Sequence, residues 1–232
     1  MSDFVLYGTP LSPFVRKVQA TLHYVDAAYD FQEIDIGAMP DWFLKISPAR
    51  RIPVLRDNTV GTHGVAGTIP DSSSICLFLD RRFNAGLFGE NPFVAGRIAW
   101  LEEYSDSVLA VTGGMKLFRP LVFPLYAGEE PDLDTAKKTW NERLPRLFDY
   151  LEASLDGAQF FVGDRYSLAD ISIGAQMTFI DLVAGLPDAE RWPALAQHTA
   201  RMKTQPGFAE NLAASREKLR GYFDSTFDLS YR

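Results

Sequence analysis

The sequence predicts a small α/β domain followed by an all-helical domain. A short apolar run over residues 4–7 and a second segment over residues 29–34 read as strands, and the segment between them carries apolar residues at helical spacing. Beyond the first third of the chain the regular spacing is helical, and no segment reads as a strand. We therefore expect a domain over residues 1–83, a linker over 84–91 and a helical domain over 92–232.

The first helix has a well-marked start. Ser12 suits the N-cap position, and Pro13 suits the first helical position, where a missing N–H costs nothing. A strand, this helix and a second strand make a right-handed βαβ unit. Ser12 is therefore expected at the N-terminus of a helix, whatever else its hydroxyl does.

The α/β domain continues with a proline in a strand-like run and a glycine-rich segment. Residues 52–55 (IPVL) read as a strand, but Pro53 gives up a ladder hydrogen bond, which predicts an edge, a bulge or a cis bond. The segment GTHGVAGT at 61–68 predicts a hairpin connection. Asp71 and Ser72 then predict the start of another helix.

Two signals mark helix starts in the second domain. Asn91 is followed by a proline, which again suits a cap and a first helical position. Ser167 and Asp170 have the spacing of a capping box, with Asp in place of the usual Glu or Gln. We interpret this box as a folding signal rather than a catalytic one.

The composition is that of an ordinary soluble globular protein, with 47% hydrophobic and 23% charged residues. A formal net charge of −7 argues against nucleic acid or an anionic membrane as partner, because phosphate binding needs clustered Lys and Arg. No apolar run approaches the roughly 18 residues of a membrane span, and the N-terminus does not read as a signal peptide. We therefore expect a cytoplasmic protein.

The single cysteine, Cys76, permits no internal disulfide and no CxxC redox pair. It falls on the apolar face of its predicted helix, so we expect a buried structural thiol. The three histidines have no metal-ligand spacing among themselves or with Cys76, so we predict no metal site. Any thiol chemistry must therefore use the thiol of another molecule.

Four segments, in the right order, resemble the cytosolic glutathione transferase family. They are similar to its opening strand, catalytic loop and first helix, to its cis-proline segment, to a helix cap and to its capping box. In this chain they read YGTPLSPFVRKV (7–18), SPARRIPVL (47–55), DSSSI (71–75) and VGDRYSLADI (162–171). Because SPF resembles the classes that use serine, the chain is identified as a serine-type member, of bacterial type.

The resemblance implies a thioredoxin-like βαβ-ββα N-terminal domain, a helical-bundle C-terminal domain and usually a homodimer. It implies a detoxification-type transferase with glutathione as co-substrate and a pocket for a hydrophobic electrophile, to which the helical domain contributes. The thiolate could act in conjugation, dehalogenation, ether cleavage or isomerisation, and the residues do not choose among these reactions. The alternative is a non-catalytic binding or interaction protein with the same fold.

Ser12 is the candidate for stabilising the glutathione thiolate. A cysteine thiol with a pKa of about 8.5 is only about 3% thiolate at pH 7, and a hydroxyl donor at a positive helix N-terminus favours the anion. One alternative is that Ser12 is only a cap. The other is that Tyr7 supplies the hydroxyl, as a tyrosine of the first strand does in some classes, although its place inside the strand favours a core or pocket-lining role.

Five further residues are expected at the glutathione site. A cis bond at Pro53 would turn the backbone of Ile52 outward, where the resemblance assigns it to the cysteinyl part of glutathione; the alternative is a trans proline on an edge strand. The resemblance assigns the glutamyl group to Asp71 and Ser72, at a helix N-terminus. Arg51 is expected either to meet a carboxylate of the tripeptide or to be a solvated surface arginine.

The co-substrate pocket is less specific, because aromatic residues at helical spacing also build cores. Family geometry points to six side chains: Leu11, Tyr104, Met115, Phe118, Arg119 and Phe123. The charge of Arg119 indicates either an acidic or polar co-substrate or a side chain that faces water.

Two features depart from the family pattern. The segment between Leu55 and Asp71 is longer and richer in glycine than the short hairpin usual there. Arg50 stands where the family commonly has a glycine, so the local backbone geometry stays open.

Overall fold

The computed structural model describes residues 2–231, and the chain divides into two compact units. The first unit comprises Met1–Gly86 and Gln205–Ser215, and the second comprises Leu87–Thr204 and Arg216–Arg232. A segment near the C-terminus thus belongs to the unit that contains the strands. The domain limits expected from the sequence stay predictions.

A four-stranded mixed sheet forms the centre of the first unit. Its strands are β1 (Phe4–Gly8), β2 (Tyr29–Glu33), β3 (Val54–Asp57) and β4 (Thr68–Ile69). The order is β2-β1-β3-β4, with β1 parallel to β2 and antiparallel to β3, and with β4 antiparallel to β3. The predicted combination of a βαβ unit with a ββα unit is therefore confirmed.

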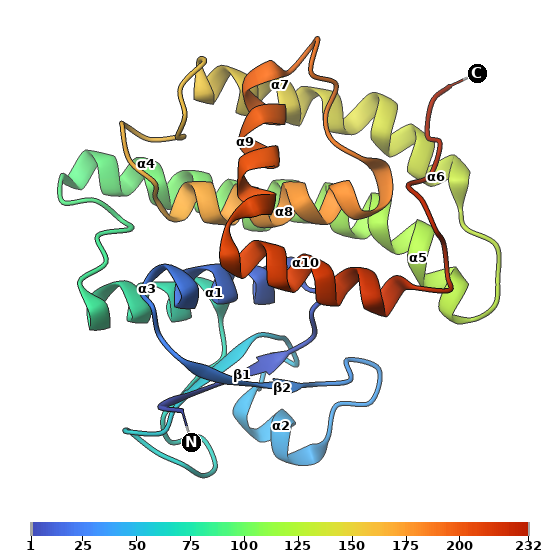
Figure 1. Ribbon diagram of the computed structural model, residues 1–232. Coiled ribbons are helices and arrows are strands. Elements are labelled where there is room, and N and C mark those ends of the chain that lie inside the picture. Colours follow the sequence, from blue (N-terminus) through green and yellow to red (C-terminus); the bar gives the residue numbers. More distant parts are fainter. Residues whose placement is uncertain (1, 232) are drawn as a thin grey trace. The chain divides into compact units, whose positions relative to one another are not determined.

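Three helices of the first unit cover the two faces of this sheet, and a fourth packs against one of these helices. They are α1 (Pro13–Tyr24), α2 (Asp41–Ile46), α3 (Ser72–Phe83) and the part of α10 (Pro206–Leu219) that ends at Ser215. Figure 1 shows α1 and α3 on one side of the sheet and α2 on the other. Val15, Val18 and Leu22 on α1 have no exposed surface, as their spacing predicts, whereas Val25, at the same spacing, follows the helix and is half-buried. Cys76 on α3 is also fully buried.

The third strand begins later than the sequence predicted. Ile52 and Pro53 precede the strand, which runs over Val54–Asp57. A proline has no N–H for the ladder, so pairing with β1 starts only at Val54, opposite Tyr7. The Ile52–Pro53 peptide bond is cis.

Arg56 organises the long glycine-rich connection between β3 and β4. Its guanidinium is buried under residues 58–67 and donates hydrogen bonds to three carbonyl groups of that connection. The acceptors are Gly61 at 3.2 Å, Gly64 at 2.8 Å and Ala66 at 2.7 Å. The predicted hairpin is present, and a single side chain holds its loop from the inside.

All regular elements in the described part of the second unit are helices. Its elements are α4 (Pro92–Glu103), the π-helical turns η1 (Tyr104–Leu109) and η2 (Val111–Phe118), α5 (Arg119–Tyr126), α6 (Leu133–Lys138), the π-helical turn η3 (Thr139–Arg143), α7 (Leu144–Leu155), α8 (Leu168–Ala184) and α9 (Pro193–Thr204). The central helix α8 is buried along almost its whole length, and Figure 1 shows α9 crossing it. Contrary to the expectation from the sequence, one continuous helical stretch, Pro92–Tyr126, is long and apolar enough to span a membrane. Core helices of soluble proteins can have the same length and composition.

The predicted capping box at the start of α8 is confirmed. Asp170 accepts hydrogen bonds from the Ser167 N–H and the Ser167 hydroxyl, both at 2.9 Å, through Oδ2. Its other oxygen accepts from the Phe161 N–H at 3.0 Å and lies 3.2 Å from Nε2 of His198. Because Asp170 and Ser167 have no exposed surface, this box is a structural element of the core.

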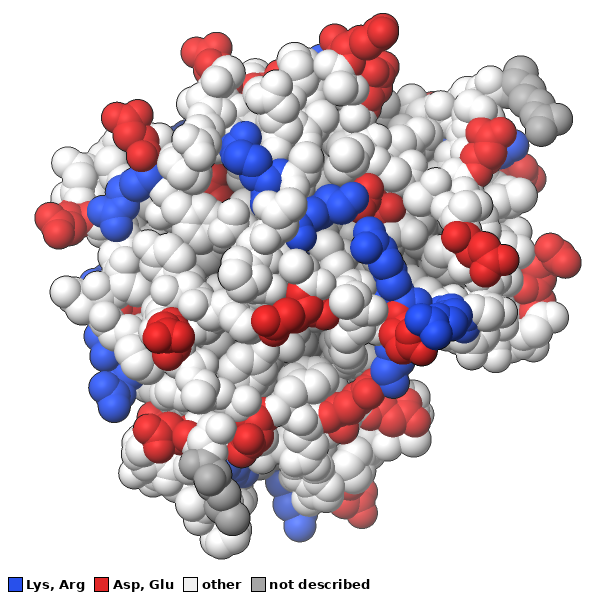
Figure 2. All heavy atoms as spheres, in the orientation of Figure 1, with Lys and Arg blue, Asp and Glu red and all other residues white. Residues whose placement is uncertain are grey.

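Charged residues of both signs are interspersed on the face that Figure 2 shows. No broad region of one sign appears on that face, and acidic side chains lie close to the basic ones. This distribution agrees with the moderate net charge of −7.

Candidate functional site

Ser12 caps α1 and keeps a hydrogen-bond donor. Its backbone is extended, its N–H bonds to the carbonyl of Thr9 at 3.1 Å, and its Oγ accepts a hydrogen bond from the Val15 N–H at 3.3 Å. A serine hydroxyl has two acceptor lone pairs and one donor, and the cap uses one acceptor. Within residues 2–231 the half-buried Ser12 O–H has no acceptor, so it can donate to a bound molecule.

The hydroxyl of Tyr7 has a different environment. Tyr7 is 7% exposed and belongs to an apolar cluster that includes Phe43 and Val54. Its ring makes an edge contact with Trp42, and its hydroxyl accepts a hydrogen bond from Nε of Arg56 at 3.4 Å. These contacts place Tyr7 in the apolar core of the first unit, which is one of the two roles expected from its place in the strand.

The segment before β3 is held by a residue that sequence analysis missed, Ser47. The fully buried Ser47 hydroxyl donates to the Arg51 carbonyl at 2.6 Å and accepts from the Arg51 N–H at 3.0 Å. Arg50, where a glycine is common in the family, has a φ of +54° and so adopts the left-handed conformation itself. The Arg51 side chain is exposed, Ile52 is half-buried and Pro53 is buried.

The first turn of α3 presents both a carboxylate and a hydroxyl. Asp71 is the exposed N-cap, and its Oδ1 accepts from the N–H and the hydroxyl of Ser74, at 2.9 and 3.0 Å. The Ser72 hydroxyl has no hydrogen-bond partner among the residues that the structure describes. A carboxylate, a hydroxyl and the N–H groups of a helix N-terminus together can hold both charged ends of an amino acid.

The sheet register brings these three segments to one end of the sheet, where β1 and β4 end and β3 begins. The carboxyl end of β1, which leads into Ser12, lies beside the start of β3, because Tyr7 is opposite Val54. The carboxyl end of β4, which leads into Asp71, lies beside the same end of β3, because Leu55 is opposite Ile69. An extended peptide placed across this end of the sheet can therefore meet all three segments.

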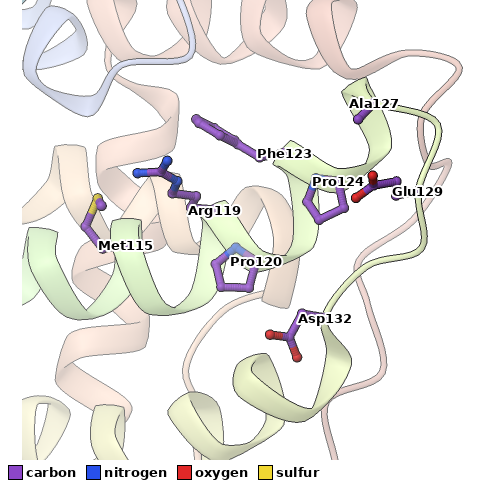
Figure 3. A pocket seen from close by; sticks show the side chains of 8 residues that line it. All are labelled: Met115, Arg119, Pro120, Phe123, Pro124, Ala127, Glu129 and Asp132. Carbon is purple, nitrogen blue, oxygen red and sulfur yellow. The ribbon is translucent and has the colours of Figure 1, made fainter.

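Three of the six predicted co-substrate residues line one pocket in the second unit. Met115, Arg119 and Phe123 project toward the same side of η2 and α5 in Figure 3, and the guanidinium of Arg119 lies 5.1 Å from the centre of the Phe123 ring. The pocket has a volume of about 460 Å³. Its other lining residues are Pro120, Pro124, Ala127, Glu129 and Asp132.

This pocket combines an apolar wall with charges of both signs. Asp132 accepts a hydrogen bond from the Thr135 N–H at 3.0 Å, as the cap of α6, and this bond lowers the pKa of its carboxyl group. The carboxylate is therefore charged at neutral pH, beside a second acidic residue, Glu129. Arg119 is exposed and has no carboxylate within ion-pair distance in the described part of the chain.

The other three predicted co-substrate residues lie elsewhere. Phe118 is 3% exposed and stacks on Phe179, with ring centres 4.1 Å apart, so it belongs to the core of the second unit. Tyr104 packs against Tyr150, and burial together with that neighbour raises the pKa of Tyr104 to about 12. Leu11 is half-buried in the first unit, next to Ser12. Within residues 2–231 no cluster of His, Cys, Asp and Glu suits a metal ion.

Comparisons with known proteins agree with this architecture. A family model described as "Glutathione S-transferase, N-terminal domain" matches residues 6–91, and one described as "Glutathione S-transferase, C-terminal domain" matches residues 116–215. Glutathione S-transferase D6 of Drosophila melanogaster is 29% identical over 217 residues, which cover 90% of this chain and 91% of that protein.

Two further relatives show the breadth of the similarity. The disulfide-bond oxidoreductase YfcG of Escherichia coli K12 is 26% identical over 173 residues, 72% of this chain and 75% of that protein. The crystal structure of a glutathione S-transferase from Sinorhizobium meliloti 1021 has the same fold, with a TM-score of 0.78 at 24% identity and with 95% of each chain covered. With two models of one family matching most of its length, this chain belongs to the glutathione S-transferase family.

Proposed function

We propose that this chain is a serine-type glutathione transferase in which the Ser12 hydroxyl stabilises the glutathione thiolate. The observation that carries the proposal is that Ser12 caps α1 as an acceptor, so its hydrogen is available to a sulfur anion in front of the helix. The helix N-terminus adds a favourable potential. Lowering the thiol pKa by two units takes roughly 2.7 kcal/mol and raises the thiolate fraction about 25-fold.

In this proposal glutathione lies across the end of the sheet where β1 and β4 end and β3 begins. The backbone N–H and carbonyl of Ile52, the residue before Pro53, pair with the cysteinyl residue as an added strand does. Asp71 binds the glutamyl ammonium group, and the Ser72 hydroxyl with the N–H groups of α3 binds the glutamyl carboxylate. Arg51 meets a carboxylate of the tripeptide, and Ser47 fixes the backbone from which it extends.

The electrophile is a hydrophobic small molecule. Met115, Arg119 and Phe123 contribute to its pocket, with an apolar surface and one guanidinium group. The thiolate attacks an electrophilic carbon and a new C–S bond forms. In a substitution, the bond from that carbon to the leaving group breaks and the leaving group departs with the electron pair. In an addition to a double bond, the π electron pair moves to the neighbouring atom, which then takes up a proton. The protein acts as a cytoplasmic homodimer of the bacterial serine type.

Three proteins test the assignment of the hydroxyl: the wild type, Ser12→Ala and Tyr7→Phe. We expect all three to be retained on immobilised glutathione, and only Ser12→Ala to lose the ultraviolet absorbance of the bound thiolate at neutral pH. Loss of that absorbance in Tyr7→Phe instead would transfer the role to Tyr7. A wild type that is not retained would favour the non-catalytic alternative.

A panel of co-substrates then identifies the reaction. It contains an aryl halide, an alkyl halide, an aryl ether, a double-bond isomerisation substrate and a mixed disulfide. The disulfide is included because a relative is named an oxidoreductase. Since Cys76 is the only cysteine and is fully buried, a disulfide reaction here would have to run on glutathione thiols alone.

A further inference from the structure

Arg16 is a charged side chain buried one helical turn after Ser12. It has no exposed surface, and its backbone N–H bonds to the Ser12 carbonyl at 3.0 Å. A guanidinium stays protonated in proteins, and its burial is unfavourable unless its N–H groups find acceptors. The partners of Arg16 therefore indicate what this position needs.

Two of these partners belong to α10, nearly two hundred residues away in the sequence. Nε of Arg16 donates to Oδ1 of Asn211 at 2.7 Å, and one terminal nitrogen donates to the Ser215 hydroxyl at 3.2 Å. Both α10 side chains are buried. The Ser215 hydroxyl in turn donates to the carbonyl of Pro10 at 2.8 Å, which lies in the turn just before Ser12.

The α10 segment is itself firmly attached to the first unit. A Cβ atom on Gly207 would lie 2.8 Å from Cα of Ala20, so only glycine permits this close approach to α1. The side-chain amide of Asn211 donates to Gln19 at 2.7 Å, and Gln19 donates to the Tyr29 hydroxyl at 3.0 Å. Ser215, which donates the hydrogen bond to the Pro10 carbonyl, therefore lies on a helix that is itself held in place against α1.

We propose that Arg16, Asn211 and Ser215 form a positioning network that holds the Pro10 carbonyl and thereby aims the Ser12 hydroxyl. The turn that carries Ser12 is closed by the hydrogen bond from the Ser12 N–H to the Thr9 carbonyl. The network adds a second, buried hydrogen bond, from Ser215 to the Pro10 carbonyl. A displacement of the turn by about 1 Å is enough to misalign a hydroxyl and a sulfur atom. This inference rests on the proposed role of Ser12.

The test compares Ser215→Ala with Thr21→Val in the full-length protein. Thr21 is a matched control, because it is also fully buried in the first unit and its hydroxyl donates to a backbone carbonyl, that of Lys17, at 2.9 Å. Two quantities are measured: amide hydrogen exchange of residues 9–16 without ligand, and the pH dependence of thiolate absorbance with bound glutathione. Arg16→Lys is a third variant, which keeps the charge but lacks the guanidinium fork.

We expect Ser215→Ala to speed exchange in residues 9–16 and to lower the thiolate fraction near neutral pH about three- to fivefold, as the loss of one buried hydrogen bond allows. Thr21→Val should lower the melting temperature without either effect. A Ser215→Ala protein with a lower melting temperature but unchanged exchange and unchanged thiol pKa would overturn the inference, and so would faster exchange without a pKa change. If the wild type forms no thiolate, the function proposed for Ser12 fails, and exchange alone decides whether the network holds the turn.

Discussion

Two serines start helices in the two units, and they use their hydroxyl groups differently. Ser12 at the start of α1 is half-buried, and its hydroxyl accepts one hydrogen bond. Ser167 at the start of α8 is fully buried, and its hydroxyl also donates to Asp170, at 2.9 Å. Both are N-caps, but only Ser12 has an unused donor within residues 2–231. Capping requires only the acceptor, so it does not exclude a second role.

The difference can be traced to the residue three positions after each serine. After Ser167 that residue is Asp170, a carboxylate that takes the hydroxyl hydrogen. After Ser12 it is Val15, which is fully buried and offers only its backbone N–H. A serine cap without an acidic or amide residue at this spacing is thus a better candidate for contact with a ligand.

The largest effect on stability is expected when the capping box at Ser167 loses its carboxylate. Asp170→Ala leaves the buried N–H groups of Ser167 and Phe161 without their acceptor, so we expect the free energy of unfolding to fall by about 4 kcal/mol. Denaturant unfolding measures this loss. The nearby exposed Asp164→Ala is the control and should change stability by less than about 0.5 kcal/mol. A loss below about 1 kcal/mol for Asp170→Ala would contradict the structural role of the box.

Ser12→Ala should affect activity far more than stability. We expect kcat/KM for glutathione to fall about 100-fold, equivalent to about 2.7 kcal/mol, because the thiolate loses its hydroxyl donor. The free energy of unfolding should fall by only about 1 kcal/mol, as for other N-caps. Steady-state kinetics and denaturant unfolding on the same samples separate the two effects. An activity within twofold of the wild type would rule out the proposed role.

Ser167→Ala should show the reverse pattern. The substitution removes the hydroxyl that caps α8, and it leaves Oδ2 of the buried Asp170 with a single described donor. We therefore expect the free energy of unfolding to fall by about 2 kcal/mol. Activity per folded molecule should be unchanged below the unfolding temperature. Active-site titration before and after mild heating checks this, and a selective loss of activity would show that the two caps are less different than their contacts indicate.

The smallest expected effect is confined to alkaline pH. Burial and Tyr150 raise the pKa of Tyr104 to about 12, above the value of about 10 in an unfolded chain. The folded state therefore favours the neutral phenol, and this contribution to stability is complete below pH 10 and is lost as the pH rises through 12. The free energy of unfolding is measured for the wild type and Tyr104→Phe at pH 9 and 11.5, and it should fall more steeply with pH in the wild type. Parallel declines would mean that Tyr104 does not contribute.

Local signals predicted much of the fold and of the candidate site. The caps at Ser12, Asp71 and Ser167 depend on a few neighbouring residues, and each is where the sequence indicates. Periodicity could not tell pocket from core, because Phe118 and Met115 lie within one helical turn and only the arrangement of α8 decides which is covered.

Contacts between distant segments were beyond the sequence. The bonds from Arg16 to Asn211 and Ser215 join the two ends of the chain, and no local pattern marks them. Ser47 was visible only as the first residue of a motif, because its two bonds to Arg51 depend on the fold of the intervening turn.

The way Arg56 holds the loop has a consequence for how this protein can diverge. Its guanidinium contacts backbone carbonyl groups at Gly61, Gly64 and Ala66, and every residue type has such a group. The side chains on the outside, including Val60 and Val65, are about two-thirds exposed and are not part of these contacts. Substitutions there are therefore nearly neutral for the fold, so the outer surface of the loop is free to acquire new specificity while the sheet beneath it stays the same.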